Sequence, residues 1–168
     1  MELVEVTVYY LEMMAPAKRV IPPPRPGLAV EHWRSPDLVS YRSLYNAVGE
    51  DYSWRTKLKM SDEALAALID DPLTEIHVLY ADGVPAGFAE FDRHQPDEIE
   101  MVQFGLTREF IGQGLGRWFL QAMIDKAWSY QPRRFWLHTC TLDHAAALPN
   151  YLKAGFVQYK YEVIRRER

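Results

Sequence analysis

Cysteine and long apolar runs are scarce in this sequence. Cys140 is the one cysteine among 168 residues, so no disulfide can form within the chain. No uninterrupted apolar run approaches the ~20 residues that a membrane-spanning helix needs. Residues 1–11 also lack the order of basic and then apolar residues that is typical of a secretory signal. These absences predict a cytoplasmic protein that has no membrane as a partner.

An excess of charge of either sign is absent as well. The 19 Lys and Arg residues nearly balance the 23 Asp and Glu residues, which gives a net charge of -4. Such a chain has no general electrostatic attraction to nucleic acid or to an anionic membrane. The arginines within residues 165–168 are too few to create one locally. Nucleic acid is therefore not expected as a partner, and any anionic ligand must be held by local geometry.

Apolar and aromatic residues are plentiful by contrast. Hydrophobic residues make up 48% of the chain, among them 7 Phe, 10 Tyr and 5 Trp. This length and balance are typical of one soluble globular domain whose core needs no metal or disulfide. We expect residues 1–27 to form an N-terminal edge strand and a proline-rich arm, and residues 28–168 to form the single domain.

The N-terminal part combines a strand pattern with a proline cluster. Apolar or aromatic side chains recur at every second position of residues 4–10, which predicts a strand over residues 3–12. We expect this strand at an edge of the sheet, where it could pair with a second copy of the chain and form a homodimer. Five of the 11 prolines fall within residues 15–27, and they predict an extended connector.

Hydrophobic periodicity predicts alternating strands and helices in the rest of the chain. Strands are expected at residues 28–33, 75–80, 86–91, 98–106, 134–140 and 156–164, and helices at residues 38–48, 62–71, 114–130 and 143–154. The strands at 98–106 and 134–140 are joined through a helix, a connection that makes them parallel. Ser61 and Asp143 are expected to cap the second and the last helix. Gly105 inside a strand predicts a bulge or the close approach of another segment.

Three glycines at alternate positions separate a predicted strand from a predicted helix. They are Gly112, Gly114 and Gly116, and they follow Ile111. Glycine lets backbone N–H groups converge, and a helix start adds the positive end of its dipole, so the turn suits an anion such as pyrophosphate. The turn could equally serve only to pack the helix closely on the sheet. A P-loop is excluded because no Lys-Ser or Lys-Thr follows, and a Rossmann motif because the glycine spacing differs.

A second motif, Tyr-x-x-x-Gly-Phe, spans residues 151–156. The order of strand, glycine turn, amphipathic helix, strand and this motif resembles the GNAT superfamily of acyl-CoA-dependent N-acetyltransferases, over residues 28–164. The resemblance implies an α/β fold with a mixed, largely antiparallel twisted sheet of about six to seven strands, flanked by about four helices. The sheet would be split between its two central parallel strands, and acetyl-CoA would bind in the split as the co-substrate.

The resemblance also assigns residues to coenzyme A. The strand before the turn would pair with the pantetheine arm through Phe104, Gly105 and Leu106. The pyrophosphate would be held by main-chain N–H groups of the turn, which are those of Ile111, Gly112, Gln113, Gly114, Leu115 and Gly116.

Nearby side chains would complete this site. Arg108 and Arg117 would be the cations beside the pyrophosphate, and His144 would lie beside the pantetheine. Ile111 stands where the family usually has Gln or Arg, and His144 stands where many members have Asn. Because backbone donors dominate phosphate binding in such a turn, we expect the chain to bind coenzyme A even though Ile111 offers no polar side chain.

Acyl transfer to an amine needs a neutral amine and a proton for the departing thiolate. By resemblance, Glu100 is the general base and Tyr151 the general acid. An ordinary phenol pKa near 10 keeps the proton until a thiolate-like leaving group forms. Strand alternation puts Glu100 on one face and Met101 on the other, and it leaves open which face borders the cleft. Cys140 carries no sign of a reactive thiolate, so direct transfer is expected.

The acceptor pocket would be built from the first helices and their loops, as in the family. Tyr45, Tyr52 and Trp54, with the acidic Glu50 and Asp51 beside them, predict an aromatic and acidic wall that would attract an amine. The same residues could instead form a small packed core.

No metal site is expected. The polar cluster His138, Cys140 and His144 lacks a fourth ligand at a suitable spacing, so it is interpreted as structural.

The sequence therefore predicts an acetyl-CoA-dependent N-acetyltransferase whose primary-amine acceptor, a small molecule or a protein amino group, is unidentified. The alternative is a non-catalytic acyl-CoA-binding sensor or interaction module with the same fold. Ile111 and His144 favour that alternative, whereas Glu100 and Tyr151 favour the enzyme.

Overall fold

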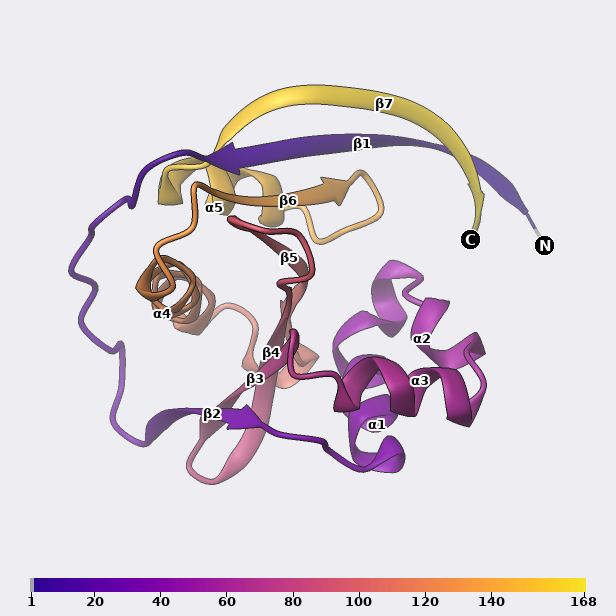
Figure 1. Ribbon diagram of the computed structural model, residues 1–168, viewed down its shortest axis with the longest axis horizontal. Coiled ribbons are helices and arrows are strands. Elements are labelled where there is room, and N and C mark those ends of the chain that lie inside the picture. The colour runs from indigo at the N-terminus through magenta and orange to yellow at the C-terminus, as the bar shows by residue number, and fades with distance from the viewer. Residues whose placement is uncertain (1) are drawn as a thin grey trace.

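A single sheet organises the chain in the computed structural model, which describes residues 2–168 (Figure 1). Its seven strands lie in the order β2-β3-β4-β5-β6-β1-β7, and every pair is antiparallel except β5 with β6. The strands are β1 (Leu3–Met13), β2 (Leu28–Trp33), β3 (Thr74–Ala81), β4 (Val84–Asp92), β5 (Glu98–Leu106), β6 (Arg134–Cys140) and β7 (Val157–Glu167). The predicted class, a mixed and largely antiparallel sheet with one parallel pair, is confirmed.

Helices cover both faces of this sheet. They are α1 (Leu38–Gly49), α2 (Thr56–Lys59), α3 (Asp62–Asp70), α4 (Leu115–Ser129) and α5 (Ala147–Ala154), with short 3-10 turns η1 (Glu50–Tyr52) and η2 (Arg108–Phe110). Figure 1 shows α1, α2 and α3 grouped on one side of the central strands and α4 on the other. This arrangement follows from helices that each bury one apolar stripe against a sheet.

The helix caps agree with the sequence at one predicted position and differ at the other. Ser61 accepts a hydrogen bond from the Ala64 N–H at 3.1 Å and caps α3 as predicted. Asp143 does not cap α5, which begins at Ala147 and has no side-chain cap. The Asp143 carboxylate accepts instead from the Thr139 hydroxyl and the Cys140 N–H, at 2.6 and 3.0 Å. The prediction was wrong because groups at the end of β6 bind the carboxylate that was expected to cap the helix.

The predicted edge position of the first strand is also wrong. β1 pairs with β7 over residues 3–12 and with β6 over residues 8–13, so it lies inside the sheet, whose edge strands are β2 and β7. Alternating side chains show which face of a strand is buried, but they carry no information on whether its edges are covered. The homodimer was expected through β1 as an edge strand, and that basis is lost because β7 covers the outer side of β1.

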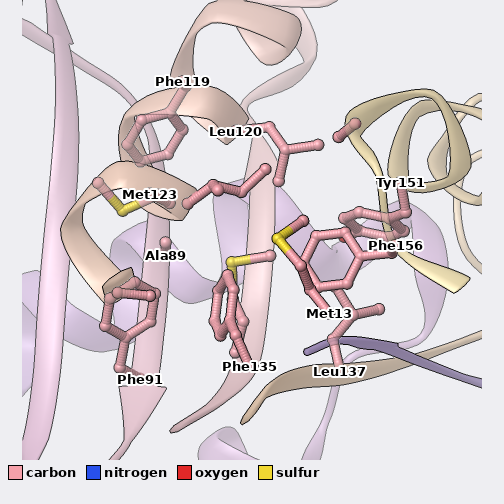
Figure 2. Packing of buried hydrophobic residues seen from close by; sticks show 14 of the residues in the cluster. Met13, Ala89, Phe91, Phe119, Leu120, Met123, Phe135, Leu137, Tyr151 and Phe156 are labelled. Atoms are coloured by element: carbon pink, nitrogen blue, oxygen red, sulfur yellow. The ribbon is translucent and has the colours of Figure 1, made fainter. Parts of the chain in front are cut away.

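Two apolar clusters lie on the two faces of the sheet. The larger one lies under α4 and α5, and Figure 2 shows Phe119, Leu120 and Met123 of α4 packed against strand side chains that include Phe91 and Phe135. The smaller one, under α1 and α3, gathers Tyr41, Tyr45, Leu65, Ile76 and Phe88. Burial of each such side chain contributes roughly 1.5–3 kcal/mol. Within residues 2–168, no helix has the length and hydropathy that a membrane crossing requires.

Candidate active site

The two parallel strands separate after three paired positions. β5 and β6 pair only at Glu98 with Arg134, Ile99 with Phe135 and Glu100 with Trp136. Beyond Glu100, β5 remains paired with β4, and β6 remains paired with β1. The facing edges of the two strands therefore have unpaired backbone groups, as the predicted split requires.

A cavity of about 360 Å³ occupies this region. It is lined from both sides of the split and from the loop after α1, by Val8, Tyr10, Tyr45, Trp54, Arg55, Thr56, Lys57, Met101, Val102, Gln103, Phe104, His138, Thr139, Cys140, Asp143, Tyr151, Ile164 and Arg166. Sequence reasoning placed four of these residues at the site: Tyr45, Trp54, Phe104 and Tyr151. The lining residues from β1 and β7 were missed, because their place beside β6 depends on pairings between the two ends of the chain.

β5 contains a bulge at Val102. Met101 faces Phe91 across the β4 pair and Gln103 faces Glu90, so Val102 is the extra residue of β5. A bulge shifts the alternation by one position. It therefore places Glu100 and Gln103 on the same face as the acidic residues of β4.

Gly105 is not the bulge that the sequence allowed, because it pairs regularly with Phe88. It is instead the close approach that the sequence also allowed. A Cβ at this position would lie 2.5 Å from Cγ1 of Val48, so the glycine lets α1 approach β5. Phe104, Gly105 and Leu106 all lie on the part of β5 that is unpaired toward β6.

The glycine turn opens directly into α4. Gly112 and Gly114 have φ angles of +84° and +79°, which favour glycine, and Gly114 is the N-cap of α4 without a side-chain hydrogen bond. The first N–H groups of α4 therefore keep the positive end of the helix dipole exposed. The Ile111 N–H donates to the Arg108 carbonyl at 3.3 Å, so the donors available in the turn begin at Gly112.

The polar side chains around this turn differ in whether they already have hydrogen-bond or ion-pair partners. Gln113 donates back to the Glu109 carbonyl at 3.0 Å. Arg108 forms a two-point ion pair with Asp51, whose carboxylate holds the arginine away from a role as a free cation beside the turn. Arg117 is exposed in the first turn of α4, next to the glycines.

Glu100 lies at the apex of the split, as the last β5 residue that pairs with β6. It is half-buried and does not itself line the cavity, although Met101 beside it does. Burial raises the pKa of its carboxyl to about 7, with the negative charges of Asp92 and Glu90 adding to the effect and Lys57 opposing it. A carboxylate with such a pKa can take up and release a proton near neutral pH.

A buried ion pair that sequence reasoning missed lies close to Glu100. The Lys57 ammonium donates to Oε2 of Glu90 at 3.1 Å, and the Tyr41 hydroxyl donates to Oε1 of the same carboxylate. Lys57 is 7% exposed and Glu90 2%. The carboxylate of Glu90 within an otherwise apolar strand was the available signal, because a buried acidic residue needs a partner.

Tyr151 faces the cavity from α5. It is 7% exposed, and its ring makes edge contacts with Phe104 and Phe156, with ring centroids 6.1 and 6.0 Å apart. Figure 2 shows it beside Phe156 at the margin of the larger apolar cluster. Burial raises the pKa of its phenol above the ordinary value, and the charge of Asp143 adds to this effect. The phenol therefore stays protonated at neutral pH.

Thiol chemistry is not favoured on the β6 side of the cavity. Burial raises the pKa of the Cys140 thiol, with Asp143 adding to the effect, and burial lowers the pKa of His138. A neutral imidazole and a protonated thiol do not make a reactive thiolate.

The predicted acceptor wall is only partly present. Tyr45 and Trp54 line the cavity, and the Trp54 indole donates to Asp143 at 3.3 Å. Tyr52 is not a lining residue, and its ring instead makes an edge contact with exposed His144 at 6.1 Å between centroids. His144 Nδ1 accepts from the Ala146 N–H at 3.0 Å.

The two acidic residues expected in that wall do not line the cavity, and both have other partners. Asp51 pairs with Arg108, and Glu50 accepts from Asn46 at 3.2 Å. The charged residues at the cavity are instead Arg55, Lys57, Asp143 and Arg166.

A polar group outside the cavity brings His32, Glu75 and His77 within 4.8 Å of one another. Both Glu75 oxygens already accept hydrogen bonds, from His77 at 2.9 Å on one side and from Arg93 and Tyr130 at 2.9 and 2.7 Å on the other. Burial alone would raise the pKa of Glu75, but these partners lower it to about 2. The group forms a closed ion network between β3 and the end of α4.

Comparison with known proteins adds an independent finding. A model of the acetyltransferase (GNAT) family matches residues 41–156, which is more than half of the chain. No curated protein matches the chain. The match spans the split strands, the glycine turn and Tyr151.

Solved structures share the fold. A GCN5-related N-acetyltransferase from Sphaerobacter thermophilus aligns with a TM-score of 0.69 at 15% identity, over 96% of this chain and 51% of that one. A functionally unknown conserved protein from Staphylococcus epidermidis aligns with a TM-score of 0.69 at 19% identity, over 96% of this chain and 61% of that one. The ribosomal-protein-S18-alanine N-acetyltransferase from Escherichia coli aligns with a TM-score of 0.64 at 20% identity, over 79% of each chain. The chain thus spans only 51% and 61% of the first two structures.

Proposed function

The chain belongs to the GNAT family of acetyltransferases, and we propose that it transfers an acetyl group directly from acetyl-CoA to a primary amine. The observation that carries the proposal is the free edge of β5, which runs from the apex at Glu100 toward the uncapped start of α4. An amide-bearing chain can pair with such an edge as an added strand, and a pyrophosphate can bind at such a helix start.

The residues present fit acetyl-CoA. In our proposal Phe104, Gly105 and Leu106 pair with the pantetheine amides, and the N–H groups from Gly112 to Gly116 hold the pyrophosphate with Arg117 beside them. The Ile111 N–H is already used at the end of η2, and the exposed His144 is proposed to lie beside the pantetheine. Bound in this way, acetyl-CoA would supply the thioester that the amine attacks.

Glu100 is the proposed general base. Its pKa of about 7 lets the carboxylate accept the amine proton near neutral pH, directly or through one water. Its position at the apex, beside the cavity-lining Met101, supports a role on the β5 side of the reaction.

Tyr151 is the proposed general acid. Its raised pKa keeps the phenol protonated until negative charge develops on the departing sulfur. The contact of its ring with Phe104, which belongs to the free part of β5, supports this role.

Aromatic residues are proposed to hold the acceptor. Tyr45 and Trp54 line the cavity, and Tyr52, which contacts His144, is proposed to contribute from outside it. Such faces suit the apolar part of an amine or its ammonium form.

Calorimetric titration with acetyl-CoA and with free coenzyme A tests the binding half of this proposal. Micromolar binding of both, followed by amine-dependent thiol release in a panel of primary amines, is the expected result. Binding without thiol release in any amine would favour a non-catalytic acyl-CoA sensor, as the replaced residues Ile111 and His144 suggest. Absence of binding to either ligand would overturn the proposal.

A further inference from the structure

The proline-rich segment, here called the arm (residues 14–27), packs along α4 instead of serving only as a connector. Its path from the end of β1 past α4 to β2 is visible in Figure 1. The Ala17 carbonyl accepts from the Gln121 amide at 3.1 Å, and a Cβ on Gly114 would lie 3.5 Å from Pro24. Arg25 donates to the Gln113 side chain at 3.4 Å. The arm therefore reaches the glycine turn itself.

Arg19 is the arm residue that joins the two helices. Its Nε donates to Oε1 of Gln121 on α4 at 3.0 Å, and its Nη1 donates to the Lys153 carbonyl on α5 at 3.3 Å. Both acceptors are neutral, so these hydrogen bonds orient the guanidinium without neutralising its charge. Gln121 is 3% exposed, and its amide donates hydrogen bonds to the Ala17 carbonyl and the Asp125 carboxylate. These contacts fix the side chain to which Arg19 is bonded.

Arg117 lies one helical turn before Gln121 on the same face of α4. Burial lowers the pKa of Arg19, and the positive charge of nearby Arg117 lowers it further. Two like charges are thus held together beside the positive end of the α4 dipole, in a chain with a net charge of -4. Arg25, the second arginine of the arm, differs because it is paired with Asp82. An arrangement of this kind is stabilised by a bound anion.

We propose that the arm is part of the nucleotide site and that Arg19 and Arg117 bind the 3′-phosphate of coenzyme A. This inference rests on the proposed function. Coenzyme A carries its pyrophosphate and its 3′-phosphate on one ribose, so the two groups are close neighbours. Gln121, which holds Arg19, lies four residues after Arg117, about 6 Å along the helix axis, so the two guanidinium groups can reach one phosphate. The anion recognised is a phosphomonoester, which offers three oxygens to the two guanidinium groups.

Calorimetric titration with coenzyme A and with 3′-dephospho-coenzyme A tests the subsite, because the two ligands differ only in that phosphate. We expect the wild-type protein to bind coenzyme A about tenfold more tightly. Arg19→Gln should weaken binding of coenzyme A about five- to tenfold and leave the affinity for the dephospho ligand within about twofold. Arg117→Gln, which also removes the cation beside the pyrophosphate, should weaken binding of both ligands, and binding of coenzyme A more strongly. Arg165→Gln removes an exposed arginine on β7, outside the arm and α4, and should change neither affinity.

The outcomes separate the subsite from the proposed function. Equal wild-type affinities for the two ligands, or variants that weaken both ligands in parallel, would overturn the subsite while the proposed function stands. Absence of binding to either ligand would overturn both. Arg19→Gln could detach the arm from α4. Arg117 is exposed on α4, so Arg117→Gln tests the subsite without disturbing the arm. Thermal unfolding of each variant shows whether the fold is kept.

Discussion

Glu100 pairs with Trp136 in the last position at which β5 and β6 are held together. One residue later the strands part, so the carboxyl group lies where the sheet changes from paired to open. This position explains two properties together: the side chain is half-buried by the converging strands, and its neighbour Met101 lines the cavity between the diverging ones. Burial and the neighbouring carboxylates then raise its pKa.

Glu100→Gln is expected to lower kcat about 100-fold, because an amide cannot accept the amine proton. The wild-type rate should fall as the pH drops through about 7, where the carboxylate becomes protonated, and the variant should lack this inflection. Initial rates across the pH range measure both effects. Glu98→Gln, two residues away on the same strand and ion-paired with Arg133 and Arg134, is the matched control and should keep the inflection. Retention of the inflection in Glu100→Gln would assign it to another group.

The same substitution has a predictable effect on stability. The folded-state pKa of Glu100 lies above the unfolded value, so the protonated form is favoured by the fold. The stability that this proton contributes is fully present below the unfolded pKa and is lost as the pH rises through about 7. Glu100→Gln, which remains neutral, should therefore gain melting temperature over the wild type above that pH and not at acidic pH. A gain of equal size at both pH values would contradict the burial argument.

Lys57→Met is expected to destabilise the protein by about 3–5 kcal/mol, because it leaves the Glu90 carboxylate buried without its cation. Glu90→Gln in the same chain should recover most of the loss, since the Tyr41 hydroxyl can still donate to the amide oxygen. Denaturant unfolding of the single and double variants measures the coupling. If Lys57→Met and the double variant were equally stable, water would be solvating the Glu90 carboxylate in the absence of Lys57.

Lys57→Met should also change the pH dependence of the reaction under conditions in which the variant is folded. The positive charge of Lys57 lowers the pKa of Glu100, so its removal should move the inflection of the pH-rate profile upward from about 7. An unchanged inflection would separate the ion pair from the proposed base.

Gly105→Ala is expected to cost about 1–3 kcal/mol, as overpacking in cores does. The added Cβ would lie 2.5 Å from Cγ1 of Val48, so either α1 or β5 must move. The second substitution Val48→Ala removes the clashing atom, and the pair should lose less stability than the sum of the two single variants. Denaturant midpoints of the four chains give this coupling. Strict additivity would show that the glycine has another role.

Local patterns were sufficient for the parallel strand pair and for the long helices, whereas the split between the two strands was implied by the family resemblance. The period of α4 and the β-α-β connection depend on neighbouring residues, and they predicted the parallel pair β5 and β6 correctly. The position of β1 depends on β7, at the other end of the chain, and no local pattern encodes that pairing. Lining residues from these strands, such as Tyr10 and Arg166, were missed for the same reason.

The face of Glu100 was undetermined for a different reason. Strict alternation makes Gln103 a neighbour of Met101 on one face, but the extra residue Val102 moves Gln103 to the face of Glu100. A bulge adds no characteristic residue type here, so the sequence contains no mark of it. Lys57 was missed because α2 spans only Thr56–Lys59, which is too short for a periodic pattern, and because lysine is rarely buried.

Tyr151→Phe is the variant that most directly tests the proposed acid. The ring should keep its contacts with Phe104 and Phe156, so the fold and the affinity for acetyl-CoA should stay nearly unchanged. Loss of the phenol proton should lower kcat about 100-fold, within the range of general acid catalysis. Steady-state rates and calorimetric titration of the same preparation measure the two effects. Phe104→Leu is the matched packing control, and it should alter acetyl-CoA affinity more than kcat. Undiminished turnover of Tyr151→Phe would remove the phenol from the reaction and leave the departing thiolate to be protonated by solvent.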